Sequence, residues 1–382
     1  MQLVRKLLPI YLAGFFYYLH YAFILFVNSS LLTSTFGERG TSILYISSSF
    51  LGIFLLFLVP RVVAIRSPKA ILITFLVLEY TAITGLITAT SPVFIALSFL
   101  LHGGSSLLIF YLTDLFLEDL TDDRITGEIR GSYLTLGNLA VALSPLAVAF
   151  LVSENNLVSI YIASLTLLLP IFFLVTLGFK SNIPVPHFKH LSLPMSKWWS
   201  LVNVRRVSIA RFVLEFFYSF MIIYTPIYLT QEIGFTWQEI GVMFSIMLLP
   251  FVLFQWPVGW LADKKYGEKE FMTSGFFIMG VTLLALPFLG KGAILWTAML
   301  FLTRVGASWV EVTTDSYFFK HIDKEDTRMI SIFRLSRPLA VITGASAGAL
   351  TLALLPFSSV FFVLSFVVFF GMKEASLLHD TR

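Results

Sequence analysis

The chain has 382 residues, of which 57% are hydrophobic and 13% are charged, with a formal net charge of +4 and no cysteine. A soluble domain carries about twice that charged fraction, so the composition excludes an ordinary soluble enzyme. The absence of cysteine excludes disulfides, thiolate metal sites and cysteine nucleophiles. The basic residues are spread over the connections between apolar runs, so the net charge does not indicate nucleic-acid binding.

Nearly all of the sequence falls into apolar runs of about 20 residues, which is the length that crosses a bilayer core of about 30 Å. The runs lack the alternating pattern of barrel strands, so we predict helices. The expected fold class is an all-α integral membrane protein with twelve transmembrane helices. The predicted spans lie near residues 7–32, 42–60, 70–89, 93–118, 129–152, 157–179, 207–231, 237–261, 272–290, 293–319, 328–352 and 354–372.

The N-terminal predicted spans hold few ionisable side chains. Tyr17, His20 and Asn28 share an arc of the first span, and His102 lies in the fourth. A single histidine in a membrane helix is most often a hydrogen-bonded interior residue. Glu79 stands in the middle of the third span, and the sequence gives it no role.

A polar, proline-bearing stretch at residues 180–206 interrupts the apolar pattern, and we predict that it is a linker. It divides an N-terminal bundle of six helices (1–179) from a C-terminal bundle of six (207–372), which a short tail follows (373–382). Trp198 and Trp199 lie in this linker beside basic residues. They indicate either a short helix on the membrane surface or an aromatic belt at the start of the next span.

The C-terminal spans hold most of the intramembrane charge. Arg304, Glu311 and Asp315 follow helical spacing in the tenth span and share one face. Because such residues are costly in a membrane, they indicate a site that binds a solute or protons, or alternatively a static ion network that braces the bundle. We assign Arg211, Glu215, Arg304 and Glu311 to the site, and Asp114, Asp315, Arg334 and Arg337 to a charge network near the inner membrane surface.

Short segments of the first half recur in order about 200 residues later. The pattern Phe54-x-x-Phe57-x-x-Pro60 returns as Phe251-x-x-Phe254-x-x-Pro257, and Thr113-Asp114 returns as Thr314-Asp315. A membrane protein made of two similar halves in tandem most often moves something between them.

The strongest local motif lies between the eighth and ninth spans. It reads Gly259-Trp-Leu-Ala-Asp263-Lys264-Lys-Tyr-Gly267-Glu-Lys269. It resembles the signature loop of the major facilitator superfamily, a family of transporters with twelve helices in two six-helix bundles. The resemblance implies that Asp263, Lys264, Gly267 and Lys269 form a hinge and gate, with Asp263 reaching toward Arg130. The alternative is a solvated turn within an ordinary cluster of basic residues.

The same resemblance implies that the seventh and tenth spans line a central cavity, with Tyr17, His20, Asn28 and His102 on the opposite wall. The expected function is secondary active transport of a small solute by alternating access, coupled to protons. Glu311 is the first choice for the proton carrier and Glu215 the second, while Arg304 is the expected anion-binding residue. We expect no cofactor, no metal, no enzymatic activity and a monomer in the lipid membrane. The glycine cluster of the family's antiport signature is missing around Pro145.

Two other functions stay open: a polytopic membrane enzyme of the acyl or glycosyl transferase type, with His20 or His102 as base, and a transport-inactive sensor. The short connections and the tandem halves count against the enzyme. The sequence does not identify the solute, because the many aromatic residues suit an apolar solute and the basic residues suit an organic anion. The sequence Gly344-x-Ser346-x-Gly348 matches a hydrolase motif, but it lies in an apolar helix and is typical of close helix packing.

The basic residues define the expected topology. Almost all of them fall on one side of the predicted spans, with Arg39 and Lys291 on the other. The positive-inside rule then places both termini and the central linker in the cytoplasm. We therefore predict a multi-pass integral membrane protein with cytoplasmic ends.

Overall fold

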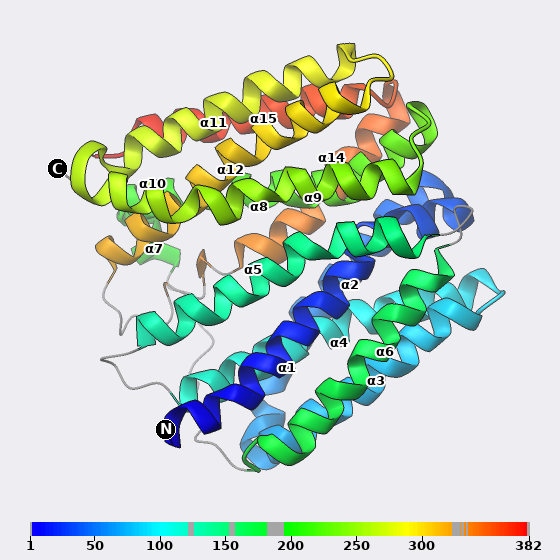
Figure 1. Cartoon of the computed structure of the whole chain (residues 1–382). Coiled ribbons are helices and arrows are strands. Elements are labelled where there is room, and N and C mark those ends of the chain that lie inside the picture. The colour runs from blue at the N-terminus through cyan, green and yellow to red at the C-terminus, as the bar shows by residue number, and fades with distance from the viewer. Residues whose placement is uncertain are drawn as a thin grey trace. The chain divides into compact units, whose positions relative to one another are not determined.

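The computed structural model describes residues 2–120, 126–152, 157–181, 195–322, 329, 332–333 and 335–379. The chain divides into two compact units, Met1–Lys189 and His190–Arg382, each of which is a helical bundle (Figure 1). The boundary between the units falls inside the stretch predicted as the linker. The limits of that linker stay a prediction.

The N-terminal unit contains six long helices. They are α1 (Gln2–Leu25), α2 (Val27–Ile65), α3 (Pro68–Thr88), α4 (Pro92–Asp119), α5 (Thr126–Leu151) and α6 (Val158–Gly178). Helix α2 is longer than predicted, because it includes the end of the first predicted span as well as the second. Its two parts meet at Gly37, whose φ of 68° is a left-handed conformation that glycine adopts without a steric cost.

Helix α1 lies at the centre of this unit and packs against α4, α5 and α6, while α3 packs against α4 and α6. The start of α3 is tied to the end of α6 by Lys69, whose Nζ donates to the carbonyl oxygens of Thr176 at 2.7 Å and Phe179 at 2.9 Å. A lysine at this place satisfies carbonyls that have no partner within the helix and complements the helix dipole. The packing holds α1, α3, α4 and α6 in fixed register.

The C-terminal unit has more interrupted helices. They are α7 (Met195–Ser200), α8 (Val202–Ile227), η1 (Tyr228–Glu232), α9 (Trp237–Leu253), α10 (Gln255–Leu261), η2 (Ala262–Tyr266), α11 (Glu268–Ala285), η3 (Leu286–Phe288), α12 (Ala293–His321), α14 (Ser336–Leu354) and α15 (Ser359–Ser376). The short helix α7 carries Trp198 and Trp199, as one of the two interpretations of that segment expected. Helix α8 begins at Val202, inside the predicted linker.

Among the described residues, ten helical stretches are long and apolar enough to cross a membrane. One of them, Leu7–Leu56, has 50 residues and covers the first two predicted spans, and the shorter apolar helix Thr135–Leu151 lies in the fifth. The all-helical class is confirmed for the described residues. A count of twelve spans requires that the long stretch be read as two spans and that the shorter helix be included.

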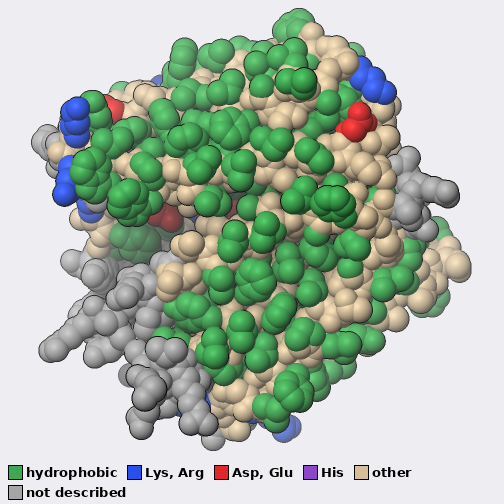
Figure 2. All heavy atoms as spheres, in the orientation of Figure 1, with side chains coloured by type: hydrophobic (Ala, Val, Ile, Leu, Met, Phe, Trp, Pro, Cys, Tyr) green, Lys and Arg blue, Asp and Glu red, His purple; other side chains and the backbone are tan. Residues whose placement is uncertain are grey.

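Hydrophobic side chains cover the helices on the face that Figure 2 shows, and charged side chains gather near helix ends. Phe150, Trp256 and Phe366 are each more than three-quarters exposed. Large exposed apolar side chains in such number are unfavourable in water but match a lipid environment. The surface therefore agrees with a multi-pass integral membrane protein.

The crossing of α11 and α12 depends on two glycines. A Cβ atom on Gly275 would lie 2.6 Å from the carbonyl oxygen of Gly306, and one on Gly306 would lie 2.3 Å from that of Gly275. Small residues of this kind let membrane helices approach closely. We expect Gly275→Ala to force the helices apart and to destabilise the protein by about 1–3 kcal/mol, as other overpacked sites do.

The midpoint of thermal unfolding in detergent measures this effect. The matched control is Gly290→Ala, because a Cβ atom there meets nothing within 4 Å. Equal midpoints for the two variants would contradict the role of the close approach.

Candidate functional site

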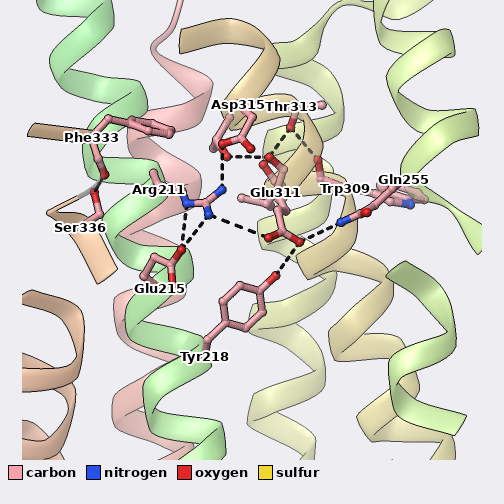
Figure 3. Close-up of polar contacts among 12 residues, drawn as sticks. Arg211, Glu215, Tyr218, Gln255, Trp309, Glu311, Thr313, Asp315, Phe333 and Ser336 are labelled. Atoms are coloured by element: carbon pink, nitrogen blue, oxygen red, sulfur yellow. Dashed lines mark hydrogen bonds and ion pairs between the residues drawn. The ribbon is translucent and has the colours of Figure 1, made fainter. Parts of the chain in front are cut away.

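Arg211 on α8 lies among three carboxylates, and we call Arg211, Glu215, Glu311 and Asp315 the Arg211 cluster (Figure 3). The Nε and Nη2 atoms of Arg211 donate to Oε1 of Glu215, one turn along α8, at 3.0 and 2.8 Å. Its Nη1 atom donates to Oδ1 of Asp315 on α12 at 2.9 Å. Its Nη2 atom also lies 3.9 Å from Oε1 of Glu311 on α12. One guanidinium thus joins α8 to α12 through ionic contacts.

Glu311 differs from the other two acids in its partners. Its Oε2 atom accepts hydrogen bonds from Tyr218 Oη at 3.3 Å and from Gln255 Nε2 at 2.8 Å, as Figure 3 shows. Both donors are neutral side chains, whereas Glu215 and Asp315 accept directly from Arg211. Glu311 is therefore the acid in the cluster with the weakest contact to a cation.

Gln255 was not predicted as a site residue. It is the first residue of α10, which follows a break in the helix at Phe254. The sequence does contain a sign of this residue's importance, because Gln255 is the only amide or ionisable side chain between Ser245 and Asp263. A lone amide in such an apolar stretch indicates a hydrogen-bonded partner inside the bundle.

The four residues of the Arg211 cluster differ in their exposure to solvent. The exposed fraction is 9% for the Glu215 side chain, 16% for Arg211, 27% for Glu311 and 49% for Asp315. Asp315 makes further contacts, and Arg334, which was predicted in the same network, lies outside the described residues. The ring of Phe333 lies 5.7 Å from the Arg211 guanidinium. The exposure of Glu311 is thus intermediate between that of the more buried Glu215 and that of the more exposed Asp315.

Arg304 and Glu311 lie on one helix, α12, but they do not form an ion pair. The Arg304 guanidinium is buried, lies 4.7 Å from the centre of the Phe217 ring, and has an Nη1 atom without a hydrogen-bond partner in the described part of the chain. The physical reason is distance, because seven residues along a helix separate two positions by about 10 Å. Arg211 on α8 is closer to Glu311 and takes its place as the cation.

The N-terminal residues predicted to line the opposite wall of a cavity have partners inside their own unit. His20 and His102 both contact Oε1 of Glu79, at 3.0 and 2.7 Å, and all three are buried. Asn28 accepts a hydrogen bond from Tyr161 Oη at 2.7 Å, and Tyr17 is buried with its ring 5.4 Å from that of His20. Both histidines are thus hydrogen-bonded interior residues with Glu79 as their shared partner, and their place on a cavity wall stays a prediction.

The signature loop ends in an acid that the sequence analysis did not single out. Gly267 has a φ of 88°, and Glu268 next to it is fully buried at the start of α11. Its Oε1 atom accepts from Ser316 Oγ at 3.0 Å and forms an ion pair with Lys320, both on α12. Lys264 lies over the ring of Trp260 at 5.2 Å. The loop is thus fixed to α12 through Glu268.

Several predicted network residues cannot be placed. The side chains of Asp263 and Arg130 lie outside the described residues, as does Arg334. Arg337 is exposed on α14, Lys269 is partly exposed and Asp114 is half-buried on α4. Among the residues that the structure describes, no group of three His, Asp or Glu side chains is arranged to hold a metal ion.

Helices long and apolar enough to cross a membrane, with a charge cluster among them, define a multi-pass membrane protein. The sequence model of the Major Facilitator Superfamily matches residues 207–378. The match covers less than half of the chain, and it shows that the C-terminal unit is similar to this superfamily. No curated protein matches the sequence significantly.

Solved transporters share the fold over the whole chain. The nucleoside transporter NupG, as a D323A mutant, aligns with a TM-score of 0.77 and 13% identity over 98% of this chain and 100% of that one. Another structure of NupG aligns with a TM-score of 0.72 and 14% identity, over 98% of this chain and 99% of that one. A bacterial homologue of the iron transporter ferroportin, in an inward-facing state, aligns with a TM-score of 0.73 and 16% identity. The alignment covers 97% of this chain and 98% of that one. At these sequence identities the similarity shows the fold, but it does not identify the transported solute.

Proposed function

We propose that this protein is a proton-coupled secondary transporter that moves a small solute by alternating access, through twelve spans in two six-helix bundles. The observation that carries the proposal is the setting of Glu311. Its carboxyl group can hold or lose a proton while Oε2 keeps accepting from Tyr218 and Gln255. A group that keeps its hydrogen bonds in both states can change charge without unfolding its surroundings.

Charge balance supports Glu311 as the proton carrier. Arg211 donates hydrogen bonds to Glu215 and Asp315 but lies 3.9 Å from Glu311, and a charge without a close counter-ion is costly within a membrane span. A proton on Glu311 removes one negative charge from the cluster. If movement of α8 against α12 changes the distance from Arg211 to Glu311, proton binding becomes linked to that movement.

Arg304 is proposed as a solute contact. A buried guanidinium with an Nη1 atom that lacks a partner in the described chain is able to bind an anionic or hydrogen-bond-accepting group. We propose that the loop of Asp263, Lys264, Gly267 and Lys269 acts as the inner gate, anchored through Glu268.

Uptake into proteoliposomes tests this function. Organic anions and uncharged aromatic solutes should be screened with a pH gradient of either direction and with none. We expect at least one organic anion to accumulate only when the gradient is present, and Arg304→Gln to reduce its uptake at least tenfold. Chemical conversion of a solute would favour the membrane enzyme, and the failure of every solute to move would favour the sensor.

Cytoplasmic termini are the second part of the proposal. The chain has no cysteine, so single cysteines report topology without background. Thr90 is exposed between α3 and α4, and Ser376 is exposed at the end of α15. In intact cells, Thr90→Cys should react with an impermeant thiol reagent and Ser376→Cys should react only after the membrane is opened. The reverse pattern would contradict the orientation.

A further inference from the structure

The N-terminal unit contains a fully buried acid between two histidines. Glu79 lies on α3, His20 on α1 and His102 on α4, and we call these three residues the Glu79 triad. Oε1 of Glu79 lies 3.0 Å from His20 Nε2 and 2.7 Å from His102 Nδ1. The proposed function makes no use of the triad. The triad lies in the N-terminal unit, whereas the Arg211 cluster lies in the C-terminal unit.

The hydrogen bonds of His20 fix the position of one proton. Its Nδ1 atom lies 2.9 Å from the backbone carbonyl oxygen of Ser164 on α6. A carbonyl oxygen can only accept, so Nδ1 carries a hydrogen. The Ser164 hydroxyl donates to the backbone oxygen of His20 at 3.0 Å, so it can only accept from Nδ1, from which it lies 2.8 Å.

The other side of His20 then leaves two arrangements. Either Nε2 also carries a hydrogen, so that a His20 cation faces a Glu79 anion, or Nε2 is bare and Glu79 holds the proton on Oε1. In both arrangements the pair has one proton more than a neutral histidine beside an ionised glutamate. The pair is therefore neutral as a whole, which is the state that a buried site favours.

His102 is the member of the triad that can exchange a proton. Its Nδ1 atom is used by Glu79, and its Nε2 atom makes no hydrogen bond with the described residues. The exposed fraction of its side chain is 4%, against 0% for those of His20 and Glu79. A neutral imidazole with one accessible nitrogen accepts a proton there without losing its bond to Glu79.

Among the described residues, the titratable side chains next to the triad are tyrosines. Helix α1 contributes Tyr17, whose ring lies 5.4 Å from that of His20, and Tyr21, whose ring lies 6.1 Å from that of His102. Helix α2 contributes Tyr45, which contacts Phe99 beside His102. Oε2 of Glu79 is buried and has no hydrogen-bond partner among the described residues.

We infer that the Glu79 triad is a proton-binding site of the N-terminal unit. The His20–Glu79 pair keeps one shared proton, and His102 takes up and releases a second proton at Nε2. The site joins α1, α3, α4 and α6, so the charge on His102 acts on four helices at once.

Nitrogen NMR of the histidine rings tests the site directly. The protein has six histidines, and His187, His190, His321 and His379 are changed to glutamine to leave the two of the triad. In lipid nanodiscs, the Nε2 signal of His102 should change between its protonated and bare forms as the pH is varied, while Nδ1 of His20 stays protonated and the His20–Glu79 pair keeps its shared proton. The infrared band of a protonated carboxyl group tells whether that proton lies on Glu79.

Two variants make the result decisive. In Glu79→Gln, His20 should become a neutral ring with hydrogen on Nδ1, because its counter-charge is gone. Ser164→Ala is the matched control, since it keeps the carbonyl oxygen that holds Nδ1, and it should leave the protonation of His20 unchanged. A pH-invariant His102, or a His20–Glu79 pair without a shared proton, would overturn the inference. The measurement needs no solute, so it is independent of whether Glu311 drives transport.

Discussion

Glu311→Gln should abolish accumulation driven by a pH gradient and leave exchange of the solute without a gradient intact. Glutamine has nearly the shape of a protonated glutamate, and its amide oxygen can accept from Tyr218 and Gln255 as Oε2 does now. It cannot release a proton. A gradient of one pH unit supplies about 1.4 kcal/mol per proton, so an accumulation of about tenfold should fall to none.

Glu215→Gln is the matched comparison, because Glu215 contacts the same guanidinium and is the second candidate for the carrier. Accumulation ratios and exchange rates should be measured for both variants in the same proteoliposomes. If the Glu311 variant still accumulates solute with the normal pH dependence, Glu311 is not the carrier. If it loses exchange and folding together, the Arg211 cluster is a static brace.

The fold class was predictable because the sequence repeats its signal many times. Apolar runs as long as a bilayer is thick leave few alternatives to helices. The local breaks were less predictable. Residues 33–41 read as a connection between two spans, but the helix continues around a single left-handed residue at Gly37. Such a break depends on the backbone conformation of one residue and not on a pattern.

The site was predictable only along each helix. The spacing of Arg211 and Glu215, and of Glu311 and Asp315, places each pair on one helix face, and the structure keeps both pairs together. Which helix faces which depends on rotation about the helix axes, so the spacing alone did not show that Arg211 on α8 is the cation near Glu311. The triad was missed for the same reason, because His20, Glu79 and His102 come from three helices. A buried Glu79 required a partner, and its identity became readable only from the packing.

Arg211→Gln should be the most destabilising single change in the charge cluster. It leaves Glu215, Glu311 and Asp315 close together without the cation that they all contact. Removing one partner of a buried ion pair costs about 3–5 kcal/mol, and the half-exposed Asp315 places the expected loss near the lower end. The loss should be smaller at acid pH, because protonation of the carboxylates relieves their repulsion.

The double variant Arg211→Gln with Glu215→Gln separates charge balance from the loss of contacts. It removes the cation and the acid that the cation binds twice, so it should recover about half of the stability that the single variant loses. Thermal or denaturant unfolding in detergent, at neutral and acid pH, gives both numbers. Equal stabilities for the single and double variants at neutral pH would mean that repulsion among the acids is not the cause. In that case the helix contacts made by the guanidinium, and not its charge, hold α8 against α12.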